Sequence, residues 1–188
     1  MNVIICPGIH EHSLTKSFIK SLLEANSYNS LNQPSVNILE FPNNNLSALS
    51  GFHIWQLLRE SLADKLNSPC VFISFSAGGV GAITAASLWQ NTVGNVKAFI
   101  AIDGWMVPKI GNFPIHRMSH DYFTHWSSCL LGSSHNNFYA QPTVDHLELW
   151  RSPSTVEGYL VDSPSEELPL SLSASEFIQI LLKRYEEI

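Results

Sequence analysis

The sequence predicts an α/β fold of three layers, in which a mostly parallel sheet is covered by helices on both faces. Short apolar runs alternate with segments whose apolar residues recur at helical spacing. The runs lack the polar alternation of half-exposed strands, which is typical of central parallel strands. The chain has 188 residues, a length that suits one domain with a sizeable core, and we expect a single domain over 1–188.

The spacing of apolar residues between turn residues predicts the first four strands and the first three helices. Each strand is a short run rich in branched and aromatic side chains, and two of the runs end just before Pro7 and Pro42. The segments between them carry apolar residues three or four positions apart. The expected strands are 3–6, 36–41, 71–74 and 96–102, and the expected helices are 14–23, 52–66 and 79–89.

The pattern is less regular after Asp103. The chain there is rich in His, Trp, Ser and Gly, and we expect a lid or insertion over 104–136. Ser173 and Glu176 have the spacing of a capping box, which predicts the start of a C-terminal helix. The other expected elements are a helix near 122–131, a short strand at 138–140, and an edge strand or a loop at 155–161.

Composition excludes several classes of protein. The net charge is −6 and the ten Lys and Arg form no cluster, which argues against nucleic-acid binding. Three scattered cysteines suit neither a disulfide framework nor a zinc site, and no cofactor motif is evident. No stretch has the length of a membrane span and no leader pattern precedes the first strand, so we expect a cytoplasmic protein.

The most informative segment surrounds Ser76. An apolar run leads to Ser74-Phe75-Ser76-Ala77, and a glycine pair then opens an Ala-rich helical stretch. This order is typical of the nucleophile elbow, a strained turn that exposes one hydroxyl at the end of a strand. The alternative is that Ser76 merely caps the helix, since serine is favoured at that position.

A serine nucleophile needs an oxyanion hole, an acid and a base. The Ala77 amide follows the nucleophile, and we favour the Ile9 amide, after Pro7-Gly8, as the second donor; the alternative is that Pro7-Gly8 only ends a strand.

Asp103 closes an apolar strand, as a catalytic acid would, although a turn aspartate is the alternative. The candidate base is His146, which is late in the chain. The rival bases or acids are His120, Asp145, Asp121 and His10.

Together, the elbow, the Pro7-Gly8 loop, Asp103 and the late His146 resemble the α/β-hydrolase family, in particular its small single-domain lipases and esterases. The resemblance implies Ser76 as nucleophile, the Ala77 amide as an oxyanion donor, and His146 as base. It departs from the family at two positions. Ser74 stands where glycine is usual, and Asp103 lies one strand earlier than the acid of most members, a known variation.

The sequence therefore predicts a serine hydrolase that cleaves a small-molecule carboxylic ester or thioester through an acyl-enzyme. A second hypothesis is a catalytically inactive scaffold of the same type that binds a small ligand or a protein partner. A third is a flavodoxin-like binding domain. The oligomeric state and the identity of the substrate are not predicted.

Overall fold

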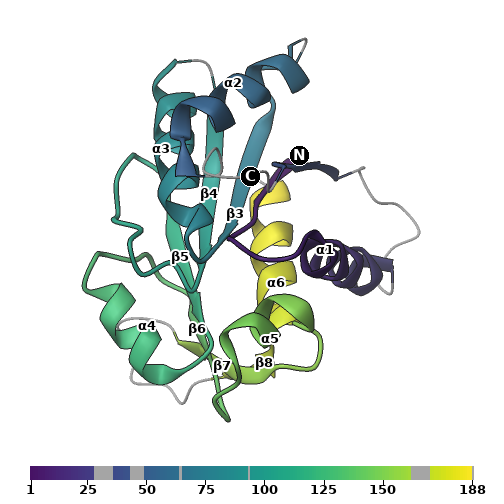
Figure 1. Cartoon of the computed structure of the whole chain (residues 1–188), viewed down its shortest axis with the longest axis vertical. Coiled ribbons are helices and arrows are strands. Elements are labelled where there is room, and N and C mark those ends of the chain that lie inside the picture. Colours follow the sequence, from purple (N-terminus) through teal and green to yellow (C-terminus); the bar gives the residue numbers. More distant parts are fainter. Residues whose placement is uncertain (28–35, 43–48, 64, 93, 162–169, 188) are drawn as a thin grey trace.

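A computed structural model describes residues 1–27, 36–42, 49–63, 65–92, 94–161 and 170–187 (Figure 1). The strands form one sheet of eight in the order β2-β1-β3-β4-β5-β6-β7-β8. The strands from β2 to β6 pair in parallel, and β7 and β8 are antiparallel. The strands are β1 Asn2–Cys6, β2 Asn37–Glu40, β3 Pro69–Phe75, β4 Asn95–Ile102, β5 Ile115–Ser119, β6 Asn137–Ala140, β7 Glu157–Val161 and β8 Leu170–Ser173.

The helices cover both faces of the sheet, which confirms the predicted three-layer α/β architecture. One core cluster joins the sheet to α1, α5 and α6, and the other joins it to α2 and α3, on opposite sides in Figure 1. The helix α4 packs against β5 and β6. The helices are α1 His12–Ser27, α2 Gly51–Ser61, α3 Gly78–Thr92, α4 Tyr122–Cys129, α5 His146–Arg151 and α6 Ala174–Glu186.

The apolar runs became strands for the expected physical reason. All five residues of β1 are buried, and so are all residues of β3 after Pro69. The predicted capping box is also present, because Ser173 accepts from the Glu176 amide while the Glu176 carboxylate accepts from the Ser173 amide. No helix in the described part of the chain is long and apolar enough to cross a membrane.

The main difference from the sequence prediction is β5, a buried strand inside the segment that we expected to be a lid or insertion. Its sequence did not indicate a strand because it contains polar residues. In the structure, hydrogen bonds to other protein groups satisfy the side chains of His116 and Arg117. His116 bonds to the Asn136 carbonyl and to the Tyr185 hydroxyl. Arg117 is 1% exposed and donates to backbone carbonyls of the loops beside it. The helix α5 and the strand β8 were also not predicted.

Replacing Arg117 with methionine should destabilise the protein by about 3 kcal/mol, because the carbonyls of Gly104, Val107 and Gly132 would lose their donor. Urea denaturation followed by circular dichroism measures this loss. Arg151→Met is the matched control, because its guanidinium is half-exposed and pairs with Glu148 at the surface. That control should change stability by less than about 0.5 kcal/mol. Equal losses in the two variants would contradict the assignment of Arg117.

Candidate active site

Four neighbouring parallel strands, β3 to β6, deliver residues to one edge of the sheet. Ser76 follows β3, Asp103 follows β4, and His120 follows β5. His146 begins α5, and five residues separate it from the end of β6. All four line one pocket of about 470 Å³, together with Ala77, Val80, Trp105 and Met106. The carboxyl edge of a parallel sheet is where ligands bind in such folds, so the topology itself produces the candidate site.

Ser76 occupies a left-handed turn between β3 and α3. Its φ is +51°, a conformation that costs free energy in a residue other than glycine. The Ser76 amide donates to the Ile102 carbonyl at 2.9 Å, and its carbonyl accepts from the Gly79 amide at 3.0 Å. The backbone is therefore held on both sides of the turn, and the half-buried side chain faces the pocket.

Small residues around Ser76 are required by close backbone approach. A Cβ at Gly78 would overlap the Pro7 carbonyl, and one at Gly79 would lie 2.5 Å from Val107 Cγ2. Gly8 contacts the turn from the first loop, where an added Cβ would lie 3.2 Å from Ser76 Cβ. These contacts give the steric reason for the glycine pair that follows Ser76 and Ala77.

The two amides predicted for the oxyanion hole are placed differently. Ala77 lines the pocket, directly before the first residue of α3. Ile9 lies in the loop after β1, whose Gly8 touches the turn at Ser76, but Ile9 itself is not among the lining residues. Among the described residues, neither amide donates to another protein group. Of the two predicted donors, Ala77 is the one that borders the pocket.

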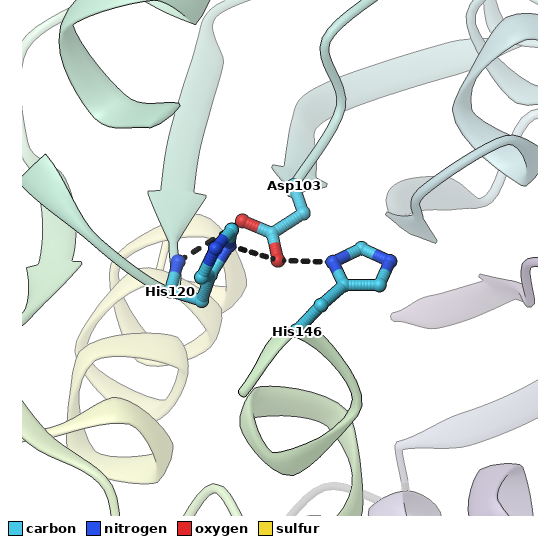
Figure 2. A group of neighbouring side chains, drawn as sticks. All are labelled: Asp103, His120 and His146. Carbon is cyan, nitrogen blue, oxygen red and sulfur yellow. Dashed lines mark hydrogen bonds and ion pairs between the residues drawn. The ribbon is translucent and has the colours of Figure 1, made fainter. Parts of the chain in front are cut away.

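Asp103 is the centre of the polar cluster (Figure 2). It also has a left-handed backbone, with φ +48°, and its side chain is 0% exposed. Oδ2 accepts from His146 Nδ1 at 2.7 Å and from His120 Nδ1 at 2.9 Å, while Oδ1 accepts from the His120 amide at 3.0 Å. Both oxygens of the carboxylate thus accept hydrogen bonds from protein groups.

Protonation in the cluster follows from these contacts. Burial acts to raise the pKa of Asp103, but the hydrogen bonds from His120 and His146 outweigh it and hold the pKa below its ordinary value. An ionised carboxylate only accepts, so both Nδ1 atoms carry a proton. In neutral His146 the lone pair then lies on Nε2, which faces away from Asp103 in Figure 2.

His146 has the environment of a general base. Its ring is 41% exposed and stacks on Phe75, the residue before Ser76, with centroids 4.7 Å apart. This stacking places the imidazole beside the turn that carries Ser76. Among the described residues, no hydrogen bond joins the Ser76 hydroxyl to an imidazole. Such bonds are often long before substrate binds, and both side chains border the same pocket.

The other candidate bases and acids lie around Asp103 and His146. The Nε2 atom of His120 faces Asp121 Oδ2 at 3.6 Å, and Asp121 caps α4 through the Thr124 amide. Asp145 precedes α5 and contributes negative charge near His120. His10 bonds to Thr15 Oγ1 at 3.0 Å, and burial together with the charge of His146 lowers its pKa.

Asp103, His120 and His146 are also residue types that ligate metals, and their ligand atoms lie within 4.8 Å of one another. A metal bound through the two Nδ1 atoms would need their lone pairs, whereas the hydrogen bonds to Asp103 use protons on the same atoms. The two arrangements therefore exclude one another at Nδ1.

Comparison with models of known protein families, and with curated proteins, found no match to this chain. The interpretation of the site therefore rests on its own geometry. Sequence reasoning missed the role of Arg117, which fixes the loop that contributes Trp105 and Met106 to the pocket. No local pattern around Arg117 could have indicated its carbonyl partners, which follow from the position of β5 in the sheet.

The cluster should make stability depend on pH. The hydrogen bond to Asp103 raises the pKa of His120, burial opposes this, and the charges of Asp103, Asp121 and Asp145 add to the rise. A raised histidine pKa gives stability that is complete below the unfolded value of about 6.5 and is lost as pH rises through the folded pKa. The stability difference between wild type and His120→Asn should therefore be larger at pH 5 than at pH 9. Urea denaturation at the two pH values measures it, and a larger difference at pH 9 would contradict the assignment.

Proposed function

We propose that the protein is a serine hydrolase with an α/β-hydrolase-like fold, which cleaves a carboxylic ester or thioester through an acyl-enzyme intermediate. The observation that carries the proposal is the 2.7 Å contact between Asp103 and His146 in the pocket that Ser76 borders from its left-handed turn. Strain at a functional turn and a buried carboxylate that orients an imidazole are the features that such a reaction needs.

Each group has one role in the proposed reaction. Ser76 Oγ attacks the carbonyl carbon while His146 Nε2 takes its proton, and Asp103 stabilises the imidazolium that forms. The negative charge that develops on the carbonyl oxygen is received by the Ala77 and Ile9 amides. The imidazolium then returns the proton to the departing alcohol or thiol. Water, activated by the same imidazole, releases the acid and restores Ser76.

The pocket lining favours an uncharged substrate group. Val80, Trp105 and Met106 present exposed apolar surface beside Ser76 and His146. Apolar side chains that border a pocket favour an apolar acyl or alcohol group. A cytoplasmic location and a small-molecule substrate stay predictions.

Hydrolysis of p-nitrophenyl butyrate and of a matched butyryl thioester tests the proposal. Wild-type protein should hydrolyse at least one of them, and the mass spectrum of an acid-quenched reaction should show one butyryl group on the chain. Folded protein that hydrolyses neither compound would contradict the proposal. Binding of butyrate esters without turnover would instead favour the catalytically inactive scaffold.

A further inference from the structure

Two imidazoles share a single oxygen of Asp103, although a general base needs only one. His120 supplies two of the three hydrogen bonds to this carboxylate, one from its ring and one from its backbone amide. His146 supplies the third, to the same Oδ2 atom. With both partners in place the Asp103 side chain is 0% exposed, so its carboxylate depends on these donors rather than on solvent.

His120 is not placed to act as the base itself. Its Nδ1 donates to Asp103, and its Nε2 faces Asp121 Oδ2 at 3.6 Å. Its ring is 18% exposed, less than half of the 41% of His146. The segment before α5 is also tied to it, because the Val144 amide donates to the His120 carbonyl at 3.2 Å. His120 therefore bonds directly to Asp103, and through Val144 it also holds the segment that leads to His146.

We propose that His120 is a positioning residue that aims Oδ2 of Asp103 at His146 and couples the protonation of the two imidazoles. This inference rests on the proposed function for its effect on the rate. One carboxylate charge serves both rings, whose centroids are 5.8 Å apart. A proton gained by His120 places positive charge beside the same Oδ2 atom and repels a second positive charge on the neighbouring ring.

The charged groups around His120 come from three elements. Asp103 follows β4, Asp121 precedes α4, and Asp145 precedes α5 beside His146. His10, in the loop after β1, also faces this group, and burial together with the charge of His146 lowers the pKa of His10. The hydrogen bond to Asp103 and the charges of the three carboxylates raise the pKa of His120 against the effect of burial, so protonated His120 is favoured toward neutral pH.

Two variants separate the positioning effect from the charge effect. His120→Asn keeps an N–H donor in the place of Nδ1 but does not titrate, whereas His120→Ala removes the donor. With the ester substrate at pH 8, His120→Ala should lose about 10²-fold in kcat with little change in KM. His120→Asn should restore most of that rate.

The pH profile of kcat/KM distinguishes the proposed coupling from a purely structural role of His120, because a structural role would leave the profile unchanged. The acid limb of kcat/KM in His120→Asn should become a single step, because the second imidazole that shares Asp103 is gone. An unchanged acid limb in a folded His120→Asn variant would overturn the coupling. A rate no higher than that of His120→Ala would overturn the positioning role.

Nuclear magnetic resonance of the wild-type imidazole protons makes the test independent of catalysis. Coupled rings should each show two titration steps, and independent one-step titrations would overturn the inference. Coupled titration in a protein that hydrolyses no ester would support the shared carboxylate and remove only the proposed function.

Discussion

Alanine at position 76 should lower the kcat of ester hydrolysis on the order of 10⁶-fold, since the variant loses the nucleophile itself. The fold should survive, because the Ser76 hydroxyl forms no hydrogen bond with the described residues. Ser76→Gly is a second variant that suits the left-handed backbone at φ +51°. Equal losses in both variants would trace the defect to the hydroxyl rather than to strain, and the rate of p-nitrophenol release measures them.

The matched control for this prediction is Ser74→Ala, two residues earlier on β3. The Ser74 hydroxyl is buried and has no hydrogen-bond partner among the described residues. Removing a buried, unsatisfied hydroxyl should leave the rate unchanged and leave stability equal or raised by about 1 kcal/mol. A comparable loss of activity in Ser74→Ala would contradict the assignment of Ser76 as the nucleophile.

Asparagine at position 103 should lower kcat on the order of 10⁴-fold. An asparagine amide cannot satisfy its three donors. If its oxygen faces the two Nδ1 atoms, its NH₂ group faces the His120 amide; if it is turned, its NH₂ group faces both rings. The first orientation sets the NH₂ group against one N–H donor. The second sets it against both rings and disturbs the tautomer that leaves the His146 lone pair on Nε2.

The loss in Asp103→Asn should appear in kcat far more than in KM, because Asp103 acts on the imidazolium formed during the reaction. Steady-state kinetics with p-nitrophenyl butyrate measures both constants. Asp145→Asn is the matched control, since Asp145 precedes α5 but forms no side-chain cap. A loss of only a few fold in Asp103→Asn would indicate that this carboxylate does not serve His146.

The parts of the fold that local pattern specifies were predictable. The strands β1, β3 and β4 consist mostly of apolar residues, and burial on both faces of the sheet favours such a composition. The turn at Ser76 was predictable because close approach restricts Gly78 to a residue without a side chain. Asp103 and His146 could be expected to lie close together, because both follow strands and the carboxyl ends of parallel strands meet at one edge of the sheet.

The strand β5 was not predictable from its own residues. Ile115-His116-Arg117-Met118-Ser119 lacks an apolar run, and its burial depends on partners far along the chain, such as Tyr185 for His116. The same limit applies to His120. Its contact with Asp103 needs β4 and β5 to be neighbours, a pairing that no sequence pattern indicated. Tertiary contacts override local propensity at both positions.

Reaction of the folded protein with a fluorophosphonate probe tests the central claim most directly, because such probes add covalently to an activated serine hydroxyl. Tandem mass spectrometry should locate a single adduct on Ser76, and Asp103→Asn should slow its formation. An adduct on another residue, or none on folded wild-type protein, would contradict the account of Ser76, His146 and Asp103 as a catalytic set.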